Sequence, residues 1–303
     1  MIKFNNVTKI FKSDLLTQPF TALSNVSFEI PEGSMVGFLG ANGAGKTTSL
    51  KIIMDFIRPS TGEVKFSNLG KDKLEIFKNI GFLPERPYFY PSLSGEDFLR
   101  FMGQLSGLSL PEIQKEMTRW APVFKIEHAL KRELKTYSKG MLQRIGFLAT
   151  ILHHPKIIIL DEPLSGLDPI GRKELKDVII QVHKEGKTVF FSSHIVPDVE
   201  EICDRVIFLK EGKLVYDGPV NRLMKNAKAQ DYFVSALTND SYNPITQIKE
   251  MVKLPDNLKR FIVTSDLKDS LLLELMTNKC NIVSVEMQKP SLEEIFYKSG
   301  SQK

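Results

Sequence analysis

The stretch GANGAGKT, residues Gly40 to Thr47, decides how the rest of the chain is interpreted. It follows the compact apolar run SMVGFLG and leads into the amphipathic segment KTTSLKIIMDFI, so we expect a strand before it and a helix after it. It matches the pattern GxxxxGK[ST] in full, in which glycines let backbone N–H groups approach a phosphate that side chains would block. Lys46 supplies a positive charge to the β- and γ-phosphates, and Thr47 offers a hydroxyl to Mg²⁺. The sequence therefore predicts a nucleotide-binding loop.

Composition and charge exclude several classes of protein. The 303 residues allow one large domain or two modest ones, and 42% are hydrophobic, which is enough for a substantial core. Only two cysteines occur, Cys203 and Cys280, and they form no CxxC motif, which argues against a zinc site and fits a reducing compartment. The net charge of +5 permits contact with anionic lipid or nucleotide but does not demand nucleic acid. The N-terminus has no apolar signal core.

The apolar runs of the chain are too short to cross a membrane. They fall well below the roughly 18–20 residues that span a bilayer. We therefore expect the chain to be soluble by itself, and we expect another subunit to supply the spans if the protein works at a membrane.

The periodicity of apolar residues predicts an α/β fold in the larger part of the chain. After Pro155, strand-like and helix-like segments alternate, which implies a parallel sheet covered on both faces. Between about residues 88 and 154 the periodicity is helical instead, with helices expected over 94–105, 111–124 and 138–152. Ser94 is a good N-cap for the first of these helices.

A smaller unit follows the larger part of the chain. We expect a domain over residues 1–220, a polar, lysine-rich linker over 221–229, and a small α+β domain over 230–303. In the small domain the helical segments are expected near 244–253 and 267–278, and in the terminal PSLEEIFYKS, which begins with a capping box formed by Ser291 and Glu294.

Two acidic residues end the apolar run KIIILDEP. A buried strand that delivers a carboxylate at its tip suits an acid associated with Mg²⁺, and Asp161 takes this role. Glu162 is one residue further on and points differently, so we expect it to polarise the water that attacks the γ-phosphate. Two solvated acids at a strand end would be the ordinary interpretation of this pair. The phosphate-binding loop makes the catalytic interpretation the stronger one.

A second glycine-containing turn occurs in YSKGM, residues 137–141. Ser138 and Gly140 begin a helix, so a hydroxyl and backbone N–H groups face outward at the positive end of the helix dipole. This turn stands at the head of a helical insertion, too far to close over the phosphate-binding loop of the same chain. We expect it to bind the γ-phosphate held by another chain.

At this point the sequence resembles the ATP-binding cassette (ABC) ATPases, whose signature is usually written LSGGQ. Ser138 and Gly140 match the serine and the second glycine, whereas Lys139 and Met141 depart from the commonest form, which we interpret as a subfamily variant. The resemblance covers roughly residues 1–220. It implies a P-loop (RecA-like) core with an antiparallel β subdomain and a helical subdomain at about 88–154.

The resemblance also implies roles for residues outside the first two motifs. SGLD, residues 165–168, resembles the D-loop that crosses the dimer seam, and His194 resembles the switch histidine that contacts the γ-phosphate. Glu85 stands where the family usually has glutamine, and its carboxylate can meet Mg²⁺ or a water bound to it. Phe11 resembles the aromatic residue that stacks on adenine. Phe20 is a competitor, because the insertion SDLLTQP lies between the two, and Phe11 is favoured.

Together these motifs predict the residues of a site for ATP and Mg²⁺. The residues expected to bind ATP are Phe11, Asn42, Gly43, Ala44, Gly45, Lys46, Thr47, Thr48, Ser138, Gly140, Asp168 and His194. The residues expected in catalysis are Lys46, Glu162 and His194, and those expected at Mg²⁺ are Thr47, Glu85 and Asp161.

The function that the resemblance implies is that of an ATP-hydrolysing transporter subunit. Two copies of the chain would bind ATP head to tail and drive a separate membrane permease from the cytoplasmic face of the cell membrane. PSLEEIF is similar to the ending of ATPase subunits of ABC-2 exporters. The aromatic residues Tyr88, Phe89 and Tyr90 either contact the permease or pack internally.

Two other functions compete with transport. ABC proteins that act on ribosomes or DNA usually have tandem cassettes or a long coiled coil, and this chain has one cassette, no heptad tract and no basic arm, so no nucleic acid partner is expected. A P-loop NTPase that works alone would have no use for the turn at Ser138.

Overall fold

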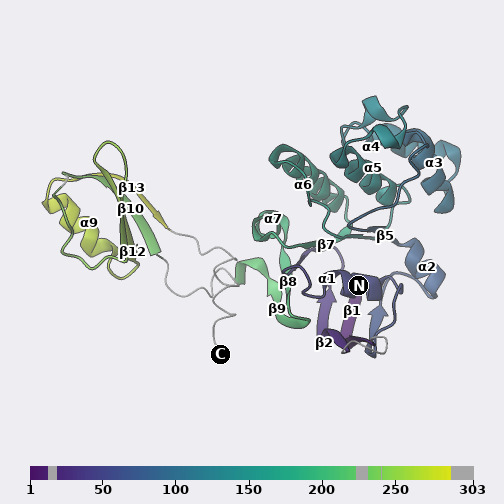
Figure 1. The fold of residues 1–303 in the computed structure, drawn as a ribbon, viewed down its shortest axis with the longest axis horizontal. Coiled ribbons are helices and arrows are strands. Elements are labelled where there is room, and N and C mark those ends of the chain that lie inside the picture. Colours follow the sequence, from purple (N-terminus) through teal and green to yellow (C-terminus); the bar gives the residue numbers. More distant parts are fainter. Residues whose placement is uncertain (13–18, 223–230, 240, 288–303) are drawn as a thin grey trace. The chain divides into compact units, whose positions relative to one another are not determined.

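The computed structural model describes residues 1–12, 19–222, 231–239 and 241–287 (Figure 1). The chain divides into two units, Met1–Val220 and Asn221–Lys303, and each is described by itself below. Within the described ranges, no helix has both the length and the apolar character that crossing a membrane requires.

A six-stranded sheet forms the centre of the first unit. All neighbouring strands are parallel except the last pair. Because parallel strands end at the same edge of a sheet, the residues that follow β3, β6 and β7 meet there. In sheet order the strands are β5 (Ile80–Leu83), β6 (Ile157–Leu160), β7 (Thr188–Ser193), β3 (Met35–Leu39), β8 (Arg205–Lys210) and β9 (Lys213–Pro219).

An antiparallel sheet of three strands, in the order β2-β1-β4, packs next to the central sheet. A chain of aromatic rings joins the two sheets: Phe4 stacks on Phe28 with centroids 4.7 Å apart, Phe28 contacts Phe38 at 5.5 Å, and Phe38 contacts Phe190 at 5.1 Å. This shared core fixes the β1–β2 hairpin beside the end of β3. The strands are β1 (Ile2–Phe11), β2 (Phe20–Ile30) and β4 (Thr61–Phe66).

The remaining elements of the first unit are helical, and α3, α4 and α5 gather in one region, as Figure 1 shows. The helices expected over 94–105 and 138–152 are confirmed as α3 and α5, and the one expected over 111–124 ends earlier, as α4. Ser94 caps α3, as predicted, by accepting a hydrogen bond from the backbone N–H of Asp97. The helices are α1 (Lys46–Ile53), α2 (Lys73–Lys78), α3 (Gly95–Leu105), α4 (Leu110–Trp120), α5 (Lys139–Ile151), α6 (Pro169–Lys184) and α7 (Val196–Ile202).

The second unit is a four-stranded antiparallel sheet with one helix. The strand order is β11-β12-β10-β13, and α9 packs on a core that includes Val234, Phe261 and Leu271. The helix expected near 267–278 is confirmed as α9. The elements are β10 (Asp231–Leu237), β11 (Glu250–Lys253), β12 (Leu258–Thr264), α9 (Lys268–Thr277) and β13 (Asn281–Met287).

The prediction of a helical segment near 244–253 is wrong. Residues 241–249 form a turn, bends and irregular backbone, and β11 follows them. The Glu274 carboxylate of α9 accepts hydrogen bonds from the backbone N–H groups of Ile245 (2.6 Å) and Thr246 (2.7 Å), and β11 pairs with β12. The backbone of this segment therefore bonds to distant parts of the unit instead of to itself.

Three other predictions fall wholly or largely on residues that the structure does not describe. They concern the insertion after Phe11, the linker at 221–229 and the terminal helix with its capping box at Ser291 and Glu294.

Candidate nucleotide-binding site

The loop between β3 and α1 is shaped by its glycines. Gly43 and Gly45 have φ angles of 81° and 105°, in the left-handed region that favours glycine. A Cβ atom on Gly40 would lie 2.6 Å from the carbonyl oxygen of Leu209, so the close packing there also needs glycine. Lys46 begins α1, is 6% exposed, and donates from Nζ to the carbonyl oxygen of Gly40 at 2.6 Å. Its charge therefore lies inside the curve of the loop.

Asp161 lies at the end of β6 and is buried. Its Oδ1 accepts a hydrogen bond from the Ser192 hydroxyl at 2.6 Å, and the Thr47 hydroxyl lies near the same carboxylate. Burial raises the pKa of Asp161, the two hydroxyl groups lower it, and the charges of Glu162 and Glu85 raise it further. A cation at this carboxylate would offset both the energetic cost of burying its charge and the repulsion from Glu162 and Glu85.

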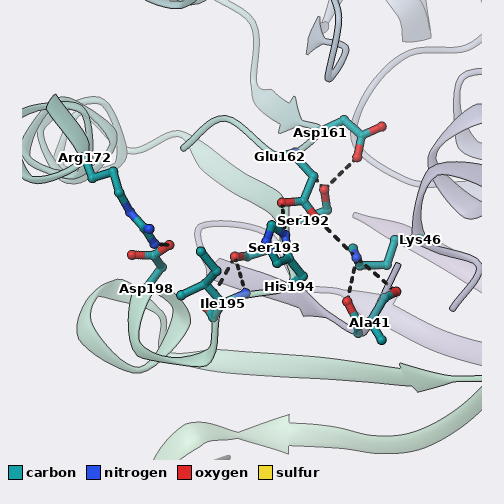
Figure 2. Close-up of polar contacts among 11 residues, drawn as sticks. Ala41, Lys46, Asp161, Glu162, Arg172, Ser192, Ser193, His194, Ile195 and Asp198 are labelled. Atoms are coloured by element: carbon teal, nitrogen blue, oxygen red, sulfur yellow. Dashed lines mark hydrogen bonds and ion pairs between the residues drawn. The ribbon is translucent and has the colours of Figure 1, made fainter. Parts of the chain in front are cut away.

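The Glu162 carboxylate lies between the side chains of Lys46 and His194 (Figure 2). Lys46 Nζ lies 3.2 Å from Oε1, and His194 Nδ1 lies 2.9 Å from Oε2. The Lys46 contact is an ion pair that is not aligned as a hydrogen bond, so Oε1 is buried without a hydrogen-bond donor among the described residues. A buried acceptor in this condition is suited to receive a proton from a bound water.

Ser192 is a site residue that the sequence did not reveal. Its hydroxyl donates to Asp161, and the same oxygen accepts from the backbone N–H of Glu162 at 2.8 Å, so one side chain fixes both acids. The pairing of β6 with β7 places Leu160 opposite Phe191, which brings Ser192 opposite Asp161. The signal in the sequence was the change from apolar to polar residues at the end of TVFFSSH.

His194 follows β7 and is held by a turn and by helix packing. Ser193 Oγ accepts from the backbone N–H of Ile195 at 2.9 Å, which fixes the turn around His194. Buried Asp198 of α7 forms an ion pair with Arg172 of α6, so the helix after His194 is tied to its neighbour, as Figure 2 shows. The His194 side chain itself is 40% exposed and can reach a ligand.

These groups border one cavity of about 360 Å³. It brings together the phosphate-binding loop, Glu162, His194 and Glu85, as the sequence predicts. Ser165 also contributes to it, although it was not among the predicted binding residues. The lining residues are Phe20, Ala22, Ala41, Asn42, Gly43, Gly45, Lys46, Thr47, Thr48, Glu85, Glu162, Ser165 and His194.

Six of the predicted residues do not line this cavity: Phe11, Ala44, Asp161, Ser138, Gly140 and Asp168. Asp161 lies behind the wall, in contact with Thr47. Phe20 lines the cavity. Phe11 is paired with Phe20 across the β1–β2 hairpin, and its ring centroid lies 4.9 Å from Lys9 Nζ. The structure therefore puts the competitor closer to the loop, and the stacking role of either ring remains a prediction.

The predicted residues Ser138, Gly140 and Asp168 border a different cavity, of about 480 Å³. Ser138 caps α5 by accepting from the backbone N–H of Met141 at 3.2 Å, and Asp168 caps α6 by accepting from that of Gly171 at 3.1 Å. A single chain therefore does not bring these residues to its own phosphate-binding loop. The cavity is lined by Lys125, Ser138, Lys139, Gly140, Met141, Arg144, Gly166, Leu167, Asp168, Gly171 and Glu174.

The oxygen donors beside the loop fit Mg²⁺. Within the described ranges there is no group of three or more His, Cys, Asp or Glu side chains arranged to hold a metal. Mg²⁺ does not require such a group in nucleotide sites, where one or two carboxylates, water and the phosphates of the substrate bind it. The Thr47 hydroxyl, the Asp161 carboxylate and the carboxylate of Glu85, which lines the cavity and acts electrostatically on Asp161, supply hard oxygen donors of this kind.

Comparison with known proteins agrees with this geometry. Residues 23–165 match the family described as ABC transporter. The chain is 31% identical to the ABC transporter ATP-binding protein YhaQ of Bacillus subtilis, over 98% of this chain and 97% of that protein. It is 30% identical to the bacitracin transport ATP-binding protein BcrA of Bacillus licheniformis, over 98% of this chain and 96% of that protein.

Solved structures extend the comparison to dimers. One is an ATP-binding cassette in a dimeric, post-hydrolysis state bound to ADP and Pi, with a TM-score of 0.65 and 26% identity, covering 73% of this chain and 99% of that chain. Another is an ATP-binding subunit of an ABC transporter, with a TM-score of 0.65 and 26% identity, covering 74% of this chain and 92% of that chain.

Ser192→Ala tests whether one hydroxyl fixes both acids. The variant leaves Asp161 Oδ1 and the Glu162 N–H without this partner, so we expect a loss of about 1–3 kcal/mol in the free energy of unfolding and a lower kcat for ATP hydrolysis. Ser34→Ala is the matched control, because its partly buried hydroxyl donates to the carbonyl oxygen of Pro31, before β3 and away from both acids. Denaturant unfolding and steady-state ATPase assays measure both variants. Equal effects in the two would contradict the role given to Ser192.

Phe20→Ala and Phe11→Ala separate the two candidates for adenine stacking. Stacking of a base on an aromatic ring contributes about 1–3 kcal/mol, so losing the stacking ring weakens ATP binding roughly fivefold or more. From the cavity lining we expect the larger loss of ATP affinity in Phe20→Ala. Titration with a fluorescent ATP analogue measures it, and a larger loss in Phe11→Ala would restore the choice made from sequence.

Proposed function

The chain belongs to the ATP-binding proteins of ABC transporters, which are ATPases, and from this premise we propose how its parts cooperate. Two copies of the chain bind two ATP molecules between them, head to tail, and drive a separate membrane permease. Each ATP lies between the phosphate-binding loop of one copy and the turn at Ser138 of the other.

The observation that carries this proposal is the separation of the two cavities. The first holds Lys46, Glu162 and His194, whereas the second holds Ser138 and Gly140. The Ser138 turn offers a capping hydroxyl and backbone N–H groups at the N-terminus of a 13-residue helix, which favours an anion. Of the two acids that border this turn in the described structure, Asp168 caps α6 and Glu174 forms ion pairs with Lys125 and Arg144. Each cavity therefore supplies what the other lacks, and a second copy is the simplest means of joining them.

The residues of the first cavity assign the steps of hydrolysis. Lys46 binds the β- and γ-phosphates. His194 contacts Oε2 of Glu162, which leaves Oε1, without a hydrogen-bond partner among the described residues, as the oxygen that accepts a proton from a water. That water gives a proton to Oε1 as its oxygen bonds to the γ-phosphorus, and the bond from phosphorus to the β-phosphate oxygen breaks, which leaves ADP and phosphate. Thr47, Asp161 and Glu85 are the residues that would hold Mg²⁺, which supplies positive charge to the phosphates when bound.

Hydrolysis then opens the dimer. The γ-phosphate is the part of ATP that touches both copies, so its loss removes the bridge between them. In γ-phosphate switches, protein segments held by the γ-phosphate are released when it is hydrolysed, and here the same change would release an interface between subunits. Closing and opening of the two copies is the motion that the permease uses.

The permease contact involves exposed aromatic residues of the helical region. Tyr88 is 80% exposed, Tyr90 is 46% exposed, and their rings meet edge to face with centroids 5.6 Å apart. The Tyr90 ring also contacts the Phe101 ring, with centroids 5.6 Å apart. The Phe89 ring instead packs against the Phe98 ring, with centroids 5.3 Å apart. We assign the exposed rings, and not Phe89, to the contact with cytoplasmic helices of the permease.

An exporter of the ABC-2 type is the transporter class that fits best, with the chain at the cytoplasmic face of the membrane. The ending PSLEEIF supports it from sequence, and the relative named for bacitracin transport supports it by similarity over nearly the whole chain. Action on ribosomes or nucleic acid is not favoured, because the relatives are transporter subunits. Co-purification of a membrane permease, and not of RNA or DNA, tests this choice.

Glu162→Gln should bind ATP but hydrolyse it at least a hundredfold more slowly, because glutamine cannot accept the proton of the attacking water. This loss corresponds to about 2.7 kcal/mol of transition-state stabilisation. The variant should accumulate as a dimer in ATP and not in ADP, which size-exclusion chromatography detects. Turnover close to that of the unchanged chain would show that another group is the base.

Ser138→Arg should abolish hydrolysis while ATP binding to the isolated chain stays within about twofold. The bulky side chain blocks the surface that receives the ATP of the other copy, but it lies outside the cavity that binds ATP in the same chain. Mixing this variant with an excess of Glu162→Gln chains should restore one complete site per mixed dimer, since each variant spoils a different half. Equal loss of binding and hydrolysis would place Ser138 in the site of its own chain.

A further inference from the structure

The second cavity carries one lysine that no described residue pairs with. Its charged residues are Lys125, Lys139, Arg144, Asp168 and Glu174. Glu174 forms ion pairs with both Lys125, at 2.7 Å, and Arg144. Across the part of the chain that the structure describes, Lys139 forms neither an ion pair nor a hydrogen bond. The charge of Lys139 is therefore available to a ligand.

The side chain of Lys139 is held at the junction of two loops. Lys139 is the first residue of α5, directly after Ser138, and its stem lies along Gly166 of the Ser165–Asp168 loop. A Cβ atom built on Gly166 would fall 2.0 Å from Lys139 Nζ and 2.8 Å from Cε, so the ammonium group lies over the glycine backbone. Lys139 is exposed, so its ammonium group lies along the Gly166 backbone at the cavity wall and remains accessible from solvent.

Asp168 is the carboxylate that could oppose an anion in this cavity. Its Oδ1 accepts from the backbone N–H of Gly171 at 3.1 Å, so this group faces the first turn of α6. The partial positive charge of the helix N-terminus offsets its negative charge there. With Glu174 matched by two cations, the charge that remains around the Ser138 turn is positive.

We propose that Lys139 binds the γ-phosphate of the ATP held by the other copy of the chain, so that the dimer forms through a charged contact. This inference rests on the proposed head-to-tail dimer. The hydroxyl of Ser138 and the backbone N–H groups of the turn are neutral donors, whereas an ammonium group donates a charge-assisted hydrogen bond that is roughly twice as strong. The lysine stands where the family's commonest signature has glycine, so this chain adds a ligand that the common form cannot supply.

The consequence is a dimer that discriminates strongly between ATP and ADP. ADP lacks the phosphate that the ammonium group contacts, so Lys139 contributes nothing to a dimer with ADP. The contact is also electrostatic, so the dimer should weaken as salt increases.

The test uses Glu162→Gln as the parent chain, because it holds ATP without turnover. Lys139→Gln and Lys139→Met in this parent should weaken ATP-driven dimerisation at least about tenfold, as measured by analytical ultracentrifugation, and should reduce its dependence on salt. Lys139→Arg should keep most of both. ATP affinity, measured at protein concentrations where the parent is monomeric, should change less than about twofold in every variant.

Two controls separate charge from packing. Lys139→Met keeps an unbranched stem along Gly166 but has no charge, so a dimer as strong as that of the parent would show that packing suffices and would overturn the inference. Lys125→Gln removes a cation of the same cavity that is already paired with Glu174, and it should change dimerisation less than about twofold.

The remaining outcomes distinguish this inference from the proposed function. A parent chain that stays monomeric in ATP contradicts the head-to-tail dimer, and the inference is then wrong as well. A parent that dimerises while all Lys139 variants match it contradicts the role of Lys139 alone. Loss of monomer ATP affinity in Lys139→Met would assign the lysine to the site of its own chain and would also overturn the inference.

Discussion

Charges buried at one edge of the parallel sheet hold one another in place, and the rest of the site depends on them. Lys46, Asp161 and Glu162 are 6%, 2% and 9% exposed. Removing an ion from water costs several kcal/mol unless partners compensate it, so each of these charges depends on the groups that contact it. Because Lys46 follows β3 and the two acids follow β6, the register of the sheet sets their separation. Ser192 of β7 then ties both acids to the third strand.

The loop Ser165–Asp168, between β6 and α6, borders two cavities of the first unit. Ser165 borders the cavity of the phosphate-binding loop, whereas Gly166, Leu167 and Asp168 border the cavity of the Ser138 turn. A segment of four residues therefore borders both cavities. In the proposed dimer each copy gives its own loop to one ATP and its turn to the other. The same segment then links the two ATP molecules, and Arg172 and Asp198 extend this link from α6 to the helix after His194.

In the second unit, contacts between distant residues determine the conformation of the connection between β10 and β11, which the periodicity of the sequence does not predict. Buried Lys259 donates to the carbonyl oxygens of Asn239 (3.0 Å) and Tyr242 (2.7 Å), and Glu274 accepts from the N–H groups of Ile245 and Thr246. Two charged side chains thus hold the connection between β10 and β11 in a non-helical form. Since each is fully engaged within the unit, this connection is a structural feature and not a candidate ligand site.

The local parts of the fold and site could be predicted from sequence because short-range physics specifies them. Residues 40–47 need their glycines and lysine at fixed spacing, and the caps at Ser94 and Ser138 bond to residues three positions later. The alternation of strands and helices after Pro155 likewise reflects burial on both faces of a parallel sheet. These features gave the phosphate-binding loop, the two acids, the turn at Ser138 and the class of the fold.

Only the tertiary structure decided the contacts that join distant segments. Strand pairing brings Ser192 to Asp161, the β1–β2 hairpin puts Phe20 and not Phe11 on the cavity wall, and loop packing lays Lys139 along Gly166. Residues 244–253 became bends, irregular backbone and a strand for the same reason. The sequence by itself determines which groups the protein has and which of them begin a helix or end a strand. Which groups meet depends on register and packing between segments, because those energies arise from neighbours that are remote along the chain.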